Sequence, residues 1–220
     1  MPLALRSLVI AGAATALGVG AGLLLTASKD SPGEGASAAG PAQTTPAAPV
    51  TGTPLIDYDS RTVTIQRSPF CDLVAPEAVQ RALGAPATEA LEYANGESAA
   101  VTKRVTDIAH EYGCSWSIAG VSARAWVFAP PVTRGQAREL VSDAAGDEKC
   151  SVLQATADFG APSVGVLCRT AEGIRTSYRG LFGDAWLACS LSGPFERDQA
   201  IERTGEFCVA AAQAASTPGS

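Results

Sequence analysis

Six cysteines, and their places in the chain, constrain the fold of this protein more than any other feature of its sequence. They are Cys71, Cys114, Cys150, Cys168, Cys189 and Cys208, and none of them lies in the apolar segment or the linker at the N-terminus. An even number of cysteines in the part of a chain that reads as folded predicts a disulfide framework. Fifteen pairings are open in principle. We favour Cys71–Cys114, Cys150–Cys168 and Cys189–Cys208, because each pair joins neighbouring elements of the predicted fold.

The sole histidine, His110, lies four residues before Cys114 and raises two alternatives, a cysteine nucleophile with its base or a metal site. The stretch CSWSI that starts at Cys114 alternates apolar and serine residues, which predicts a strand. Residues four apart on a strand lie roughly 13 Å apart, too far for a nucleophile and its base. No two cysteines have the C-x-x-C spacing typical of zinc and redox sites. We therefore expect a disulfide at Cys114, and no metal, cofactor or catalytic residue.

An uncharged, apolar run over residues 7–27 follows Arg6. Its roughly twenty residues would span a hydrocarbon core of about 30 Å as a helix, whereas the apolar part of a secretory signal has only about 7–15 residues. The run predicts a single-pass signal anchor, with residues 1–6 in the cytoplasm and the C-terminal part outside the cell. Cleavage of the segment and secretion is the alternative. No cysteine follows the run, which excludes a lipoprotein attachment site.

The rest of the chain divides by composition. Residues 28–54 are almost entirely Ala, Gly, Pro, Ser and Thr, which is typical of a disordered linker. Residues 55–215 carry the apolar periodicity of a folded, extracytoplasmic domain, and residues 216–220 form a short tail.

The periodicity within residues 55–215 predicts an α+β fold, an antiparallel sheet stabilised by disulfides with helices packed on one face. Strands are expected at residues 62–65, 112–118, 123–129, 163–168, 173–182 and 185–191, and helices at 71–84, 133–146 and 196–215. Thr133 and Gln136 have the spacing of a capping box, and Gly183-Asp184 that of a two-residue hairpin turn. The stretch around Asn95-Gly96 reads as a loop. Cys-Ser-Trp-Ser at 114–117 is similar to Cys-Ser-Leu-Ser at 189–192, a short match compatible with two similar halves.

One polar cluster stands out on the predicted strand 173–182. Arg175, Ser177 and Arg179 share a face of that strand by two-residue alternation, and Arg169 lies on the preceding strand across a short turn. Three guanidiniums close together could bind a carboxylate or a phosphate bidentately. The alternative is an ordinary solvated face paired with local acids such as Glu172.

Catalytic signatures are missing from the sequence, which has no G-x-S-x-G, H-E-x-x-H, Walker or dinucleotide motif. The formal charge of −6 argues against a nucleic-acid partner, whose binding surface would be basic. A pair of carboxylates for glycoside hydrolysis stays open, because many acidic residues follow the linker.

Two short motifs resemble those of a family of uncharacterised actinobacterial cell-envelope domains. The motifs are Cys71-Asp72-Leu73 opening a helix that ends at Leu83-Gly84, and Cys114-Ser115-Trp116 on a strand. The resemblance implies that Cys71 and Cys114 correspond to bridging cysteines, and it implies no activity, because the family has none assigned. Many members are lipoproteins, and this chain departs from them by lacking the lipid-bearing cysteine.

Together these features predict a membrane-anchored, extracytoplasmic binding or accessory domain of the actinobacterial cell envelope. Its expected partners are the membrane, through the N-terminal helix, and an envelope protein or small ligand. The alternatives are a carboxylate-dependent envelope hydrolase and a purely structural envelope protein.

Overall fold

The structure, a computed structural model, describes residues 52–102, 105–154 and 156–216. The expected cytoplasmic N-terminus (1–6), the membrane segment (7–27) and most of the linker (28–51) lie outside the described residues, as do residues 217–220 of the tail. Within the described ranges, no helix combines the length and the apolar character needed to cross a membrane.

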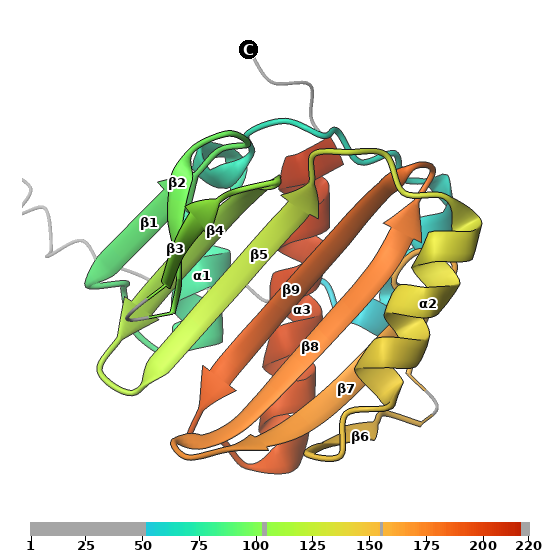
Figure 1. Cartoon of the computed structure of the whole chain (residues 1–220). Helices are drawn as coiled ribbons and strands as arrows, with labels where there is room; N and C mark the ends of the chain where they lie inside the picture. The colour runs from blue at the N-terminus through green and yellow to red at the C-terminus, as the bar shows by residue number, and fades with distance from the viewer. Residues whose placement is uncertain (1–51, 103–104, 155, 217–220) are drawn as a thin grey trace, which may run out of the picture. The chain divides into compact units, whose positions relative to one another are not determined.

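Seven strands form one antiparallel sheet in the order β1-β4-β5-β9-β8-β7-β6 (Figure 1). Their bounds, across the sheet, are β1 (Glu89–Tyr93), β4 (Glu111–Ile118), β5 (Val121–Phe128), β9 (Ala185–Gly193), β8 (Gly173–Phe182), β7 (Ser163–Thr170) and β6 (Cys150–Val152). A second, two-stranded sheet consists of β2 (Ser98–Thr102) and β3 (Val105–Ile108). The predicted α+β fold with an antiparallel sheet is thereby confirmed.

Helices α1 (Pro76–Leu83) and α3 (Arg197–Ser216) pack on one face of this sheet, which we call the α3 face. Leu187, Cys189 and Leu191 of β9 point to this face and join the main core with Phe207 of α3. All three of these β9 residues are fully buried, with no exposed surface. These apolar side chains at alternate positions of β9 therefore decide which face of the sheet meets α3.

Helix α2 (Arg134–Ala145) packs on the opposite face, which we call the outer face. Ala137 of α2 forms a small cluster there with Leu181 and Trp186, and Ala144 forms another with Val164 and Val166. In Figure 1, α2 lies in front of the sheet and α3 behind it. This corrects the expectation that the helices share one face. The physical reason is that β7 and β8 carry apolar residues on both faces at this end of the sheet.

Two local predictions hold in detail. Thr133 Oγ1 accepts the backbone N–H of Gln136 at 3.3 Å, and Gln136 Oε1 accepts the N–H of Thr133 at 2.9 Å, which completes the capping box of α2. Gly183, with φ at +67°, and Asp184 form the turn that joins β8 to β9, where Phe182 pairs with Ala185. That backbone conformation favours glycine.

Several elements differ from the sequence expectation. The segment 62–65 does not form the expected strand. It begins at the end of a 3-10 turn, Ser60–Thr62, and pairs with no strand among the described residues. The expected helix at 71–84 begins with a 3-10 turn, Cys71–Leu73, before α1 proper starts at Pro76. The stretch around Asn95-Gly96 is the turn between β1 and β2, and strands β1, β2, β3 and β6 were not predicted.

Three disulfides join the six cysteines in the pairs that the sequence analysis favours, and no cysteine is free. Cys71–Cys114 ties the segment before α1 to β4, Cys150–Cys168 joins β6 to β7, and Cys189–Cys208 ties β9 to α3. Because its sulfur is bonded to Cys71, Cys114 has no thiolate that His110 could activate. Three such bonds indicate an oxidising, extracytoplasmic compartment.

We predict that replacing Cys189 and Cys208 together by alanine lowers the free energy of unfolding by about 3 kcal/mol or more. The reason is that the bond closes a loop with a sequence separation of 19, and both side chains are fully buried. Chemical denaturation without reductant measures the loss. The matched control, Cys150→Ala with Cys168→Ala, opens a loop with a separation of 18 at the edge of the sheet and should cost less. Equal losses would contradict the role of Cys189–Cys208 as the main link between sheet and helix.

Candidate functional site

Strand β8 carries the arginines that the sequence singles out, and its register decides where their side chains lie. Arg175 pairs with Cys168 on β7 and Ser192 on β9, and Arg179 pairs with Val164 and Ala188. Val164 and Cys168 belong to the cluster under α2, so both arginines lie on the outer face.

Arg169 does not join them. It pairs with Ile174, which packs against the core on the α3 face. Paired residues on neighbouring strands share a face, so Arg169 lies on the opposite side of the sheet from Arg175 and Arg179. The predicted trio of guanidiniums is therefore corrected to a pair.

Ser177 lies midway between the two arginines on β8. Its side chain is 1% exposed, and its hydroxyl has no hydrogen-bond partner among the described residues. Arg175 and Arg179 are roughly 13 Å apart along the strand, a gap that two long side chains can close above Ser177. A buried hydroxyl without a partner costs about 1–3 kcal/mol, so a group that reached it would be stabilised.

Arg179, a charged residue, also has a buried polar atom without a hydrogen-bond partner within the described ranges. It is half-buried, and its Nε is buried without a hydrogen-bond partner in the described part of the chain. The ion pairs among the described residues involve Arg61, Arg67 and Arg81, and neither Arg175 nor Arg179.

The charges around Arg179 also favour the binding of an anion. Burial lowers the pKa of its guanidinium, the positive charge of Arg175 lowers it further, and Asp147 raises it. Two cations held near each other without a contacting carboxylate attract an anion. The two guanidiniums can therefore bind a carboxylate or phosphate.

The outer face continues across the sheet as serines and a third arginine, which sequence reasoning missed as a site. One row of paired residues runs Ser117, Ser122, Ser192 and Arg175, and the next runs Ser115, Arg124, Ser190 and Ser177. The signal in the sequence was the repeated Cys-Ser-x-Ser motif, because in both copies the cysteine points to the α3 face and the serines to the outer face.

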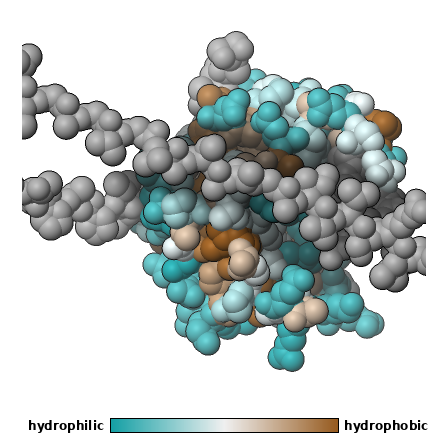
Figure 2. Space-filling view, turned by 90° about the vertical axis from the view of Figure 1, so that its left-hand side faces the viewer, coloured by the Kyte–Doolittle hydropathy of each residue, from teal (hydrophilic) through white to brown (hydrophobic). Residues whose placement is uncertain are grey.

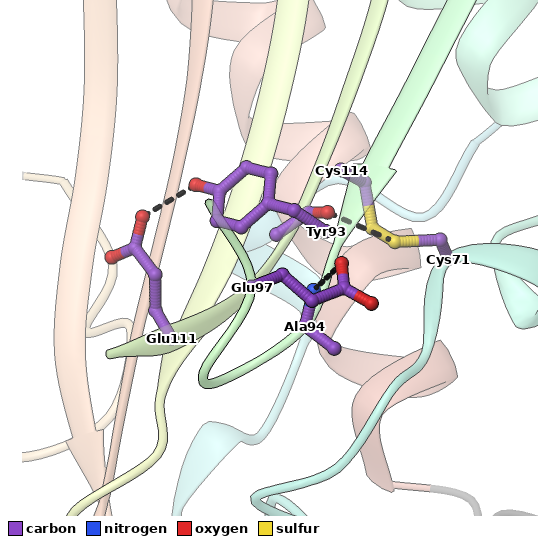
Figure 3. The surroundings of a disulfide bond; sticks show 7 residues. Cys71, Tyr93, Ala94, Glu97, Glu111 and Cys114 are labelled. Carbon is purple, nitrogen blue, oxygen red and sulfur yellow. Dashed lines mark hydrogen bonds between the residues drawn. A yellow bond between two sulfur atoms is a disulfide. The ribbon is translucent and has the colours of Figure 1, made fainter. Parts of the chain in front are cut away.

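Tyr93 of β1 lies on the far side of the outer face, where it hydrogen-bonds with Arg124. Its hydroxyl donates a hydrogen bond to Glu111 Oε1, and its ring lies over Gly113, where a Cβ would overlap it (Figure 3). Burial, the bond to Glu111 and the charge of that carboxylate raise the pKa of Tyr93 to about 12, against a lowering by Arg124.

Two grooves lie elsewhere on the described residues. One, of about 510 Å³, is lined by Cys71 and carries three carboxylates, Asp72, Glu92 and Glu97. Glu97 is already used there, because its Oε2 accepts the N–H of Ala94 at 2.9 Å. The other, of about 620 Å³ between α1 and α3, has acids and arginines that pair, with Arg81 Nε 3.7 Å from a Glu206 oxygen. No group of three or more metal-ligating side chains occurs in the ranges that the structure describes.

The side of the molecule that carries edge strand β1 faces the viewer in Figure 2, where hydrophobic side chains lie among hydrophilic ones. Leu91 of β1 is 69% exposed and Leu73, on the rim of the first groove, is 44% exposed. Single exposed apolar side chains are common on protein surfaces, so neither marks a site by itself.

Comparison with known proteins leaves the family open. No family model matches the chain, and no curated protein matches it. Among solved structures, it is similar to the extracellular domain of PknH from Mycobacterium tuberculosis, with a TM-score of 0.42, 13% sequence identity, and coverage of 70% of this chain and 99% of that one. At that degree of similarity the likeness supports no argument about function. The resemblance to actinobacterial envelope domains stays a prediction.

We predict that Tyr93 and Tyr178 ionise late, each with a pKa raised to about 12, in Tyr178 by burial alone. Because the folded state holds these phenols neutral, their stabilising contribution is complete below the unfolded pKa of about 10 and is lost as the pH rises from there through about 12. Phenolate absorbance during an alkaline titration measures this. Tyr93→Phe should remove one late-ionising group while Tyr112→Phe leaves both. If Tyr93→Phe left the late component unchanged, the raised pKa of Tyr93 would be contradicted, and with it the burial of its phenol and the hydrogen bond to Glu111.

Proposed function

We propose that this chain is an anion-binding domain of the actinobacterial cell envelope, anchored to the membrane by residues 7–27 and held outside the cytoplasm by the linker 28–54, with no catalysis assigned to it. The observation that carries the proposal is Arg179, a half-buried guanidinium with an unpaired Nε, beside the unpaired, buried hydroxyl of Ser177. The disulfides support the extracytoplasmic placement, because such bonds form and persist in oxidising compartments.

A carboxylate or a phosphate would supply the hydrogen-bond acceptor that Arg179 lacks among the described residues. Guanidinium groups bind such oxyanions through two parallel N–H donors, and these charge-assisted hydrogen bonds are stronger than neutral ones. Arg175 and Arg179 approach from the two sides of Ser177, so one anion could accept from both. Binding would also relieve the repulsion between the two cations, which lowers the pKa of Arg179 in the free protein.

The point where the linker meets the domain supports a free binding face. Leu55, at the start of the domain, packs on the α3 face, where it lies against Gly205 of α3. Gly52 approaches Glu206 of the same helix. The chain thus enters on the side of the sheet opposite to Arg175 and Arg179.

We predict that Arg179→Ala raises the dissociation constant for citrate or inorganic phosphate by roughly tenfold or more, since it removes a charge-assisted hydrogen bond. Amide shifts of the domain in low salt, recorded by NMR during a titration, measure the affinity. Arg169→Ala is the matched control, because it removes the same charge from the opposite face of the sheet. Equal weakening in the two variants would mean that binding responds only to net charge, and the site would be wrong.

Arg179→Met separates binding from folding. Without an anion, this variant should unfold at the same or a higher temperature than the wild type, because it removes a buried charge that has no partner. A marked fall in the midpoint would show that the guanidinium serves the fold rather than a ligand.

The anchoring is tested on the full chain in bacterial membranes. We predict that alkaline washing leaves the protein in the membrane fraction, that protease added outside the cell digests residues 55–215, and that deletion of residues 7–27 releases the domain. An uncleaved apolar helix of this length stays inserted under such washing. Recovery of the protein from the medium, with its N-terminus beyond residue 27, would favour the secreted alternative.

A further inference from the structure

Four neighbouring strands, β4, β5, β9 and β8, present a hydroxyl-rich surface next to the arginine pair. Adjacent strands lie about 4.8 Å apart, so the row Ser117, Ser122, Ser192 and Arg175 extends over roughly 14 Å. The parallel row of Ser115, Arg124, Ser190 and Ser177 lies two residues further along each strand. The only helix that packs on this face in the described ranges, α2, contacts β6, β7 and β8.

Two accessible serines in the middle of this surface have no internal side-chain partner among the residues that the structure describes. Ser122 and Ser192 are partly exposed, and no side-chain hydrogen bond is formed by either within the described ranges. Arg124 and Arg175 are exposed, and Arg124 hydrogen-bonds with the Tyr93 hydroxyl, whereas Ser190 is buried. At the base of the surface, Ser177 is 1% exposed and its hydroxyl is unpaired. Donors and acceptors thus recur at regular intervals in two dimensions, with guanidiniums among them.

None of these eight residues lines either groove, so the surface suits a ligand that lies across strands rather than one enclosed in a cavity. Trp126, partly exposed, lies on the same face two strands from Arg179, with Ala188 between them. An indole ring at that position can stack on the apolar face of a sugar, whereas the serine hydroxyls can exchange hydrogen bonds with sugar hydroxyls.

We infer that the outer face of β4, β5, β9 and β8 binds an acidic polysaccharide, with its carboxylates on Arg124, Arg175 and Arg179 and its hydroxyls on the partly exposed serines of the two rows, Ser115, Ser117, Ser122 and Ser192. This rests on the proposed anion-binding function and names its ligand class. Guanidiniums supply the charge complementarity, and the length of the rows calls for a polymer instead of a single anion.

The charge around the surface disfavours a densely charged polymer. Glu89 lies at the end of the first row, where it accepts a hydrogen bond from Ser117 at 3.2 Å, and Glu111 binds Tyr93 at the same side of the sheet. The formal charge of the whole chain is −6. A ligand with many hydroxyls and few carboxylates meets less repulsion here than polyphosphate or nucleic acid would.

The test titrates the domain with four probes and follows its amide shifts by NMR. The probes are oligogalacturonate, galacturonate monomer, a neutral dextran oligosaccharide and polyphosphate. Oligogalacturonate should bind roughly tenfold or more tightly than each of the others. Ser122→Ala with Ser192→Ala should weaken binding of oligogalacturonate by roughly threefold to tenfold and leave the galacturonate monomer unaffected, because the rows contact only a longer ligand.

Two controls match these changes. Ser151→Ala removes a serine from β6 that pairs with Leu167 on the α3 face, and Arg169→Gln removes a charge from that same face as a control for Arg124→Gln. Neither control should alter the binding of oligogalacturonate. Thermal unfolding of every variant verifies that the fold is intact.

The outcomes separate the inference from the function on which it rests. Equal affinity for the monomer and the oligomer, without an effect of the serine changes, would overturn the polysaccharide and leave the anion site standing. Polyphosphate binding as tightly as oligogalacturonate would overturn it too, since charge alone would then suffice. If no anionic probe bound at all, both proposals would fail.

Discussion

The bond between Cys189 and Cys208 fixes which side of β9 meets α3, and the rest of the molecule depends on that choice. Leu187, Cys189 and Leu191 are all fully buried against the helix. Ser190, between Cys189 and Leu191, and Ser192, after Leu191, must then point to the outer face, because side chains alternate along a strand. A shift of one residue would turn the serines toward α3 and the leucines away from it, and the disulfide could not form. One covalent link thus specifies both a hydrophobic core and the polar surface behind it.

That polar surface contains groups that the fold itself does not satisfy. A buried charge without a partner is usually less favourable than an apolar side chain of the same size, so Arg179 is not explained by the stability of the sheet. The same holds for Ser177, whose hydroxyl would be replaced by a methyl group at no loss of a hydrogen bond in the free protein. Departures from local optimisation of this kind concentrate at functional sites. The two residues are two apart on one strand, which is why they read as one site.

Much of this arrangement follows from the sequence, and the exceptions have physical causes. The cysteine pairs and the strands 112–118, 163–168, 173–182 and 185–191 follow from alternation and from the proximity of neighbouring elements. The sequence analysis grouped Arg169 with Arg175 and Arg179, because assigning residues to two strands does not say which residues of the two strands share a face of the sheet. The length of the connecting turn, the two residues Ala171-Glu172, does determine the shared face, because this turn pairs Thr170 with Gly173 and therefore Arg169 with Ile174. Strands β1 and β6 were not predicted because β1 is mostly exposed and β6 has only three residues. Neither therefore shows the alternation of apolar and polar residues that predicts a strand. The burial of Ser177 depends on tertiary packing and has no local signal.

The repeated Cys-Ser-x-Ser motif explains how two parts of the sheet form one surface. In each copy the cysteine is bonded on the α3 face, Cys114 to Cys71 and Cys189 to Cys208, and the serines face outward. Strand β5 lies between the two copies and pairs with both, so Arg124 stands between Ser115 and Ser190. Four strands therefore share one continuous polar surface. Helix α2 does not extend over it, because α2 is held by apolar residues such as Val164, Val166 and Leu181, and the serine rows offer it no comparable contact. The polar residues at Ser115, Ser117, Ser122, Arg124 and Ser192, on the side of the sheet opposite the buried core, thus leave this part of the surface open to a ligand.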